Sequence, residues 1–274
     1  MKKIIFSALA ALAFVGVSCS SDDNSIGNGD GGVTPPNKNI KLISQVVTVD
    51  DAHPADKLTF NVNYDNDSKV TSVVGNESND EYFVGEATFK YEEKTKLTEV
   101  KAGGDLFPVQ LLLDSNKSLY KYGKVLEYDK KGNPTKILMH YDEYLFEELG
   151  GTKQGILELE YDNNPNFTFH TMRAMGIIDA IKGVNVIFND ATGNPVNKLL
   201  SELISVNNMV KGKVYLEDGT LIRTTTVTYD FDEQLYPKSA VVTNIGIERD
   251  YNFQNEVKYI PYSESGRVMF EYKK

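Results

Sequence analysis

The residues that most often carry out chemistry are few in this chain and lie far apart. The three histidines, His53, His140 and His170, form no His-Glu-x-x-His or His-x-His pattern, so they predict no metal site. No Gly-x-Ser-x-Gly turn is present to expose a nucleophilic serine. The single cysteine, Cys19, lies near the N-terminus. From these residues we predict no catalytic residue, no metal site and no bound cofactor.

The acidic residues are numerous, but their spacing indicates turns. Asp65 and Asp67, and likewise Asp230 and Asp232, are spaced as in the first part of a calcium-binding loop. Both segments lack the glycine and the closing glutamate that such a loop requires. Aspartate side chains also accept hydrogen bonds from backbone N–H groups two residues further on, so we expect both segments to form turns.

The N-terminal residues indicate where the protein is located. Lys2 and Lys3 precede an apolar segment at 4–17, which is shorter than the ~20 residues of a membrane-spanning helix. Small residues then lead to Cys19. This arrangement resembles a bacterial lipoprotein signal, although Gly16 replaces the usual aliphatic residue. We therefore expect residues 1–18 to be a signal peptide and Cys19 to be the site of lipidation.

The next segment, residues 19–39, has the composition of a flexible linker. It is rich in Ser, Asp, Gly, Asn and Pro and has almost nothing to bury. Residues 20–23, Ser-Ser-Asp-Asp, resemble the acidic surface-export tag that follows the lipidated cysteine in many Bacteroidetes lipoproteins. We expect an outer-membrane lipoprotein that lies on the cell surface or faces the periplasm.

The charge of the chain restricts its partners. The formal net charge is −10, and cleavage of the signal peptide would remove Lys2 and Lys3 and so make the charge more negative. This sign opposes binding to nucleic-acid phosphates and adhesion to anionic lipid headgroups. We therefore expect no nucleic-acid partner, and contact with the membrane through the acyl chains of a lipid anchor.

The rest of the chain, residues 40–274, contains a repeated hairpin pattern. Each copy is an alternating strand that ends in Tyr-Asp or Tyr-Glu, followed by a polar turn and a second strand. In one copy the turn is Lys131-Gly132-Asn133-Pro134, which supplies residues that tolerate positive φ and a proline that ends the turn. The marker tyrosines are Tyr64, Tyr91, Tyr128, Tyr161, Tyr229 and Tyr272. We predict a mainly β single domain: an antiparallel meander curled into a barrel-like or strongly twisted sheet.

The region between Tyr161 and Tyr229 interrupts this pattern. Residues 170–182 carry apolar side chains at helical spacing and stop at Gly183. Asn194-Pro195 has the residue types of a helix N-terminus and precedes a second apolar stripe that ends at Ile204. We predict a small helical insertion near residues 170–206 that covers one end of the sheet.

Taken together, the motifs resemble those of a family of Bacteroidetes lipoproteins, a domain of unknown function described as having a porin-like fold. The resemblance depends on the Cys-Ser-Ser-Asp-Asp address, the Tyr-Asp-x-x-Gly-Asn-Pro hairpin, the Asn-Asn-Pro-Asn-Phe element at 163–167 and the terminal Glu-Tyr strand. It implies a curved antiparallel sheet and transfers no catalytic residue. A porin itself is not expected, because residues 90–94 place charges on both faces of a strand, where a lipid-facing band requires apolar side chains.

The remaining candidates for a site are tyrosines outside the repeat. We nominate Tyr141, Tyr144, Tyr259 and Tyr262 as ligand-binding residues, because their rings are less constrained by packing within the sheet. The leading hypothesis is a tethered, non-enzymatic binding or scaffolding module for a glycan or peptide. The alternatives are a hydrolase with carboxylates in the barrel mouth and a carrier of an apolar ligand inside the barrel.

Overall fold

The strands of a computed structural model of the protein form one large antiparallel sheet. The structure describes residues 40–77, 80–92, 96–102, 105–108, 123–140, 154–176, 185–189, 195–199, 205–249 and 259–274. The first eight strands are β1 (Ile43–Asp50), β2 (Lys57–Tyr64), β3 (Val70–Glu77), β4 (Asp80–Glu92), β5 (Lys96–Ala102), β6 (Asp105–Pro108), β7 (Gly123–Tyr128) and β8 (Pro134–His140). The remaining elements are β9 (Gln154–Pro165), α5 (Phe169–Ala174), β10 (Asn185–Asn189), β11 (Pro195–Leu199), β12 (Asn207–Leu216), β13 (Leu221–Phe231), β14 (Pro237–Arg249) and β15 (Tyr259–Tyr272).

Thirteen strands pair in the order β6-β5-β4-β3-β2-β1-β15-β14-β13-β12-β9-β8-β7. Every described pairing in this order is antiparallel, and most neighbours are consecutive in the chain. The exceptions are β1 with β15, which joins the two ends of the body, and β9 with β12, which spans the insertion. The predicted antiparallel meander is confirmed. The order begins at β6 and ends at β7, so the sheet formed by the described strands is open.

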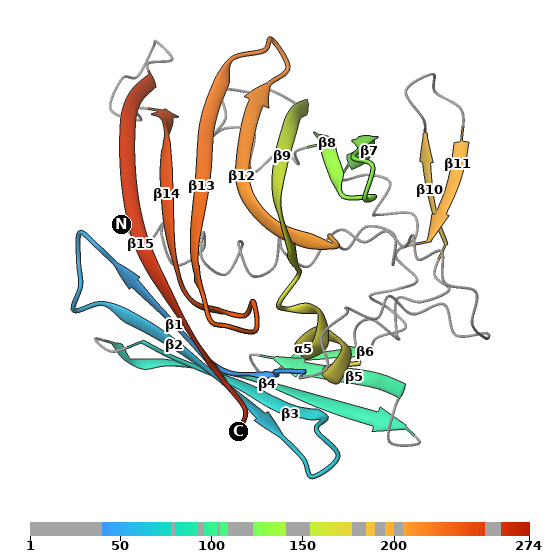
Figure 1. Ribbon diagram of the computed structural model, residues 1–274, viewed down its shortest axis with the longest axis vertical. Helices are drawn as coiled ribbons and strands as arrows, with labels where there is room; N and C mark the ends of the chain where they lie inside the picture. The colour runs from blue at the N-terminus through green and yellow to red at the C-terminus, as the bar shows by residue number, and fades with distance from the viewer. Residues whose placement is uncertain are drawn as a thin grey trace.

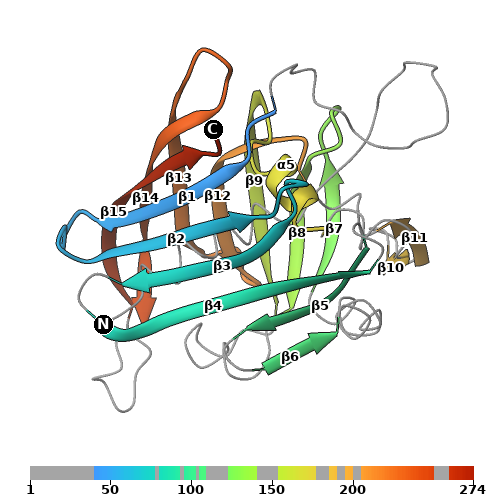
Figure 2. The ribbon, with the colours of Figure 1, turned by 90° about the horizontal axis from the view of Figure 1, so that it is seen from below.

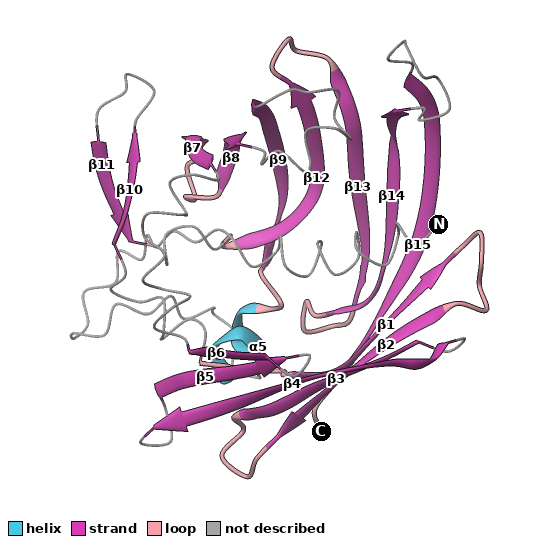
Figure 3. Ribbon diagram, turned by 180° about the vertical axis from the view of Figure 1, so that it is seen from behind, coloured by secondary structure: helices cyan, strands magenta, loops and turns pink. Residues whose placement is uncertain are grey.

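The sheet bends into two arms that face each other across α5. Figure 1 shows β1 to β6 crossing below β9 and β12 to β15, with the long strand β15 running from one arm into the other. Figure 2 views the first arm from below, and Figure 3 shows α5 in the angle between the arms. We call the face that packs towards α5 the inner face; its core includes Val62, Val70, Val227, Val268 and Ala174 of α5. The outer face carries ion pairs such as Lys211–Glu160 and Lys136–Glu158.

The predicted helical insertion is confirmed at its start by α5, whereas the second predicted helix is wrong at residues 195–199, which form a strand. Helix α5 ends at Ala174, and Gly176 has φ +75°, so the left-handed glycine that stops the helix is Gly176, well before Gly183. A Cβ at Gly176 would lie 3.0 Å from the Cβ of Leu97, which leaves no room for another residue type. Residues 177–184 lie outside the described residues.

The first residues of the second predicted helix form strand β11 instead, and this strand pairs with β10. Pro195 is its first residue, a position where the missing N–H costs no ladder hydrogen bond. Pairing with the β-forming residues Val186, Ile187 and Phe188 therefore overrides the helical spacing of the apolar residues from Val196 onward.

Candidate functional site

Five of the six marker tyrosines of the repeat are structural; the sixth, Tyr128, is 36% exposed. The hydroxyl of Tyr64 donates to the carbonyl of Ile43 (2.5 Å), and that of Tyr91 donates to the carbonyl of Val70 (2.7 Å). The later copies make the same kind of bond: Tyr161 to Pro134, Tyr229 to Met209 and Tyr272 to Pro237. Burial raises the pKa of Tyr64 and of Tyr91 to about 12, so both hydroxyls keep their protons. Each ring locks one hairpin to a strand that precedes it in the chain, which leaves these tyrosines unsuited to a ligand.

The aspartates that follow the tyrosines form the predicted turns. Oδ1 of Asp129 accepts hydrogen bonds from the N–H groups of Lys131 (2.8 Å) and Asn133 (2.9 Å). The N–H of Asp129 donates to the carbonyl of Asn133, and Gly132 has φ +87°. The loop at Asp65 repeats this pattern, with Ser68 at the positive-φ position. No cation is needed to explain these carboxylates.

In the last complete copy of the repeat, the turn is displaced from the expected aspartate. Asp230 pairs with Lys238 (3.1 Å) on the outer face, because β13 continues to Phe231. Asp232 opens the turn instead, accepting from the N–H groups of Gln234 and Tyr236, and Leu235 takes the positive φ of 63°.

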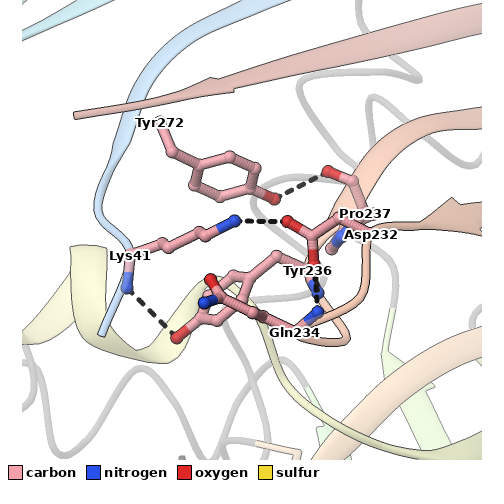
Figure 4. A network of polar contacts seen from close by, with 6 residues as sticks. All are labelled: Lys41, Asp232, Gln234, Tyr236, Pro237 and Tyr272. Atoms are coloured by element: carbon pink, nitrogen blue, oxygen red, sulfur yellow. Dashed lines mark hydrogen bonds and ion pairs between the residues drawn. The ribbon is translucent and has the colours of Figure 1, made fainter. Parts of the chain in front are cut away.

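A network around Asp232 joins the beginning and the end of the described body. The ammonium of Lys41 donates to Oδ2 of Asp232 and lies 5.6 Å and 5.7 Å from the ring centroids of Tyr236 and Tyr272 (Figure 4). Burial alone would raise the pKa of Asp232, but Lys41 and the two N–H groups hold it below its usual value. Because Lys41 lies just before β1 and Tyr272 ends β15, this network is a clamp that fastens both ends of the described body.

A second polar group, which we call the asparagine cluster, consists of Asn133, Asp162, Asn207 and Asn208. Oδ1 of Asn133 accepts from the N–H groups of Val206 (2.8 Å) and Asn207 (3.2 Å). Its Nδ2 donates to Asp129 (2.8 Å) and to Oδ1 of Asn207 (3.0 Å). All four hydrogen-bonding positions of this side chain, which is 0% exposed, are therefore used.

The carboxylate of Asp162 completes the asparagine cluster. Its two oxygens accept from the backbone N–H and the side-chain amide of Asn208, both at 3.1 Å. They also accept from the same two groups of Asn164. Asn208, also 0% exposed, in turn accepts from the N–H of Phe167, just before α5. The cluster thus ties together the β7–β8 turn, the end of β9 and the start of β12, and its bonds are internal.

A third polar group lies on the inner face of β13, β14 and β15, and we call it the polar row: Arg223, Thr225, Asn244, Glu264 and Tyr262. The strand registers pair Thr225 with Asn244 and Asn244 with Glu264, and one step further along they pair Arg223 with Gly246 and Gly246 with Tyr262. Oγ1 of Thr225 donates to Oδ1 of Asn244 (2.6 Å), and Nδ2 of Asn244 donates to Oε1 of Glu264 (3.0 Å). Asn244 is only 5% exposed, whereas the other four side chains are half-buried.

Gly246 gives the polar row its shape. A Cβ on Gly246 would lie 2.3 Å from the carbonyl oxygen of Ile222 and 2.9 Å from Cε1 of Tyr262. Only glycine therefore fits, and the Tyr262 ring lies over this position from the strand opposite Arg223. The result is a tyrosine and an arginine on the two strands that flank a glycine, with the bonded asparagine and glutamate two residues further along.

Arg223 differs from the other polar residues in having an unused donor. Among the buried side-chain polar atoms of the described residues, only Nε of Arg223 and Nε2 of His170 have no hydrogen-bond partner. A buried N–H without an acceptor is costly, and unsatisfied groups of this kind are rare in folded proteins. The polar row is therefore incomplete in a way that the asparagine cluster is not.

The two histidines whose side chains are described, His53 and His170, do not form a site together. His170 lies on α5, packs edge-on against Phe169 and is 8% exposed; burial, and then the charge of Arg173, lowers its pKa. His53 is exposed and lies 3.2 Å from Asp50. His140 is in β8. The described residues contain no group of three His, Cys, Asp or Glu side chains that is placed to hold a metal ion.

Of the residues nominated from the sequence, only Tyr259 and Tyr262 are in described segments. Cys19, Tyr141 and Tyr144 lie outside the described residues. Tyr259 and Tyr262 are both on β15, but they are an odd number of residues apart, so strand alternation places them on opposite faces. Tyr262 faces the polar row and Tyr259 faces outward, so the two do not make one patch.

Sequence reasoning missed Arg223, Thr225, Asn244 and Glu264. The sequence of β14 gives no clear signal, because the exposed positions Val241 and Ile245 are as apolar as the inward positions Ala240 and Val242 that Asn244 follows. An inward polar residue in a strand needs a partner or a purpose, but only the register with β13 and β15 shows which residues meet it.

Comparison with known proteins gives a distant structural neighbour. No family model matches the chain, and no curated protein matches it. Among solved structures, the chain is similar to the crystal structure of a porin-like protein from Bacteroides uniformis. The sequence identity is 9% and the TM-score 0.34, over 84% of this chain and 98% of that one. Within the described part of the chain, no helix has the length and apolar character needed to cross a bilayer.

Proposed function

We propose that the protein is a lipid-anchored envelope protein that binds a glycan on the inner face of its sheet, at the polar row. The observation that carries the proposal is the unused donor of Arg223, a residue that faces Tyr262 across Gly246 in the strand registers. Proteins orient a polar ligand with a few precisely placed groups, and the polar row offers four kinds: an aromatic ring, an amide, a carboxylate and a hydroxyl.

The position of the polar row favours a glycan over a peptide. Peptides are commonly bound by adding a strand to a free sheet edge, where backbone groups provide the affinity. β14 is paired on one side with β13 and on the other with β15, so its backbone is already used. Recognition at the row must therefore come from side chains, which suits the hydroxyl groups and flat C–H faces of a sugar.

The anchor and the linker complete the proposal. Cys19 would hold the protein at the outer membrane, and residues 20–39 would separate the body from the bilayer by a flexible coil of about 25 Å on average. The clamp at Lys41 then begins directly after this tether, so a pull on the linker is transmitted to β1, β15 and the β13–β14 turn. The protein would capture its ligand close to the membrane surface without converting it.

The experiment is a glycan array probed with the full-length protein purified in detergent. We expect binding to a group of related glycans, and Tyr262→Ala should weaken the affinity by about 10- to 100-fold if the ring is a stacking residue. Tyr259→Ala is the matched control, because it removes the same ring from the other face of the same strand. An equal loss of affinity in both variants, or binding that neither variant changes, would overturn the proposal.

A further inference from the structure

The chemistry of Arg223 narrows the class of ligand, if the proposed function holds. A guanidinium carries five N–H donors in a rigid plane and binds planar anions through two parallel hydrogen bonds. One such geometry uses Nε together with one terminal nitrogen. Nε of Arg223 is the atom left without a partner, while the side chain as a whole is half-buried.

We infer that the ligand of the polar row is an acidic sugar, whose carboxylate is bound side-on by Arg223. Nε is closed off from solvent but the side chain as a whole is half-buried, so a carboxylate that turns the guanidinium towards itself supplies the acceptor that Nε lacks. Binding then removes a cost present in the unbound protein. A methionine at this position would avoid the cost.

The rest of the row fits the remaining parts of a hexuronic acid. Tyr262 lies across Gly246 from Arg223, so a sugar held by its carboxylate places a C–H face near the ring. Thr225, Asn244 and Glu264 lie two residues further along their strands, about 7 Å away, where they meet the hydroxyl groups of the same or the next sugar.

The charges around the site favour a ligand group with one negative charge, such as a carboxylate, over a group with two. Arg223 is the one cation of the polar row and Glu264 its one anion, and the whole chain has a net charge of −10. A phosphate ester with two negative charges would be repelled by Glu264 and by the protein as a whole. A single carboxylate balances Arg223 and leaves Glu264 to accept from hydroxyl groups.

The test uses pairs of probes that differ only in the carboxylate. We would titrate the full-length protein calorimetrically with oligogalacturonides and oligoglucuronides, each as the free acid and as the methyl ester. We expect the acids to bind at least about tenfold more tightly than their esters, with Arg223→Gln abolishing this preference. Lys238→Gln, which removes the same charge from an exposed ion pair on the outer face, is the matched control and should change nothing.

The outcomes separate this inference from the proposed function. If neutral glycans bind as well as acids, with Tyr262→Ala weakening both and Arg223→Gln neither, the acidic ligand is wrong and the glycan site stands. If Arg223→Gln and Lys238→Gln weaken binding equally, the preference is long-range attraction and the side-on contact is wrong. If no glycan binds, acidic or neutral, both proposals fail.

Discussion

The asparagine cluster and the polar row are built from the same kinds of residue but differ in completeness. Asn133 uses all four of its hydrogen-bonding positions, and both oxygens of Asp162 accept two bonds each. In the polar row, Thr225, Asn244 and Glu264 form a chain of two bonds, and Nε of Arg223 beside them has no acceptor.

This difference separates structure from function. A network whose bonds are all internal stabilises the elements that it joins, and it has nothing left to offer a ligand. A half-satisfied network lowers stability unless a partner completes it, and this is the reason for proposing a ligand at the polar row. The same comparison identifies five of the six marker tyrosines as structural, since their hydroxyls donate to backbone carbonyls.

The largest effect is expected from opening the asparagine cluster. Asn133→Ala leaves the backbone N–H groups of Val206 and Asn207 without an acceptor, and it leaves Oδ1 of Asn207 without the donor at Asn133. At about 1–3 kcal/mol for an unsatisfied buried group, we expect a loss of about 3 kcal/mol in the free energy of unfolding. Thermal unfolding should shift down by roughly 6–12 °C.

The control for Asn133 is Asn163→Ala. Asn163 is exposed, and its Oδ1 accepts only from the ammonium of Lys131, so its removal should leave the melting temperature nearly unchanged. Similar shifts in the two variants would mean that burial of the cluster contributes nothing to stability.

A smaller loss is expected at the turn that presents Asn133 to the cluster. Gly132→Val forces a β-branched residue into φ +87°, at a cost of about 1–2 kcal/mol, or several degrees in melting temperature. The loop between β13 and β14 allows the opposite change, from a non-glycine residue to glycine. Leu235 in this loop already has φ +63° and is exposed, so Leu235→Gly should raise the melting temperature slightly. Shifts of the same sign in both variants would show that positive φ is not what these loops require.

The clamp at Lys41 should contribute less to the free energy of unfolding than the asparagine cluster, because it is partly exposed. This contribution should depend on pH. The pKa of Asp232 is lowered in the folded state, so the pair stabilises above the unfolded pKa of about 4 and is lost as the pH falls through the folded value. Lys41→Met should lower the melting temperature by about 2–4 °C at pH 7, and this difference should shrink on acidification. Lys238→Met, in a more exposed pair, should show neither effect, and a Lys41 difference that grows in acid would refute the assignment.

The fold was predictable where the information is local. Alternation and turn residues give the hairpins, and Asp65 and Asp129 make the predicted contacts with N–H groups two residues on. The pairing of β9 with β12 across an insertion is not local, and neither is the strand at Pro195, where tertiary pairing overrides an apolar stripe. The polar row is the extreme case: Tyr262 could be nominated from its position outside the repeat, but Arg223, Asn244 and Glu264 meet only through the registers of three strands.

The most direct test of the central claim is the melting temperature of Arg223→Met without any ligand. Methionine keeps much of the apolar stem and removes the buried N–H that has no acceptor. If the polar row awaits a ligand, the variant should melt within about 2 °C of the wild type or above it, because the fold loses no satisfied bond at Nε. A fall as large as that of Asn133→Ala would contradict the account, because it would show that Arg223 is as much a part of the structure as the asparagine cluster.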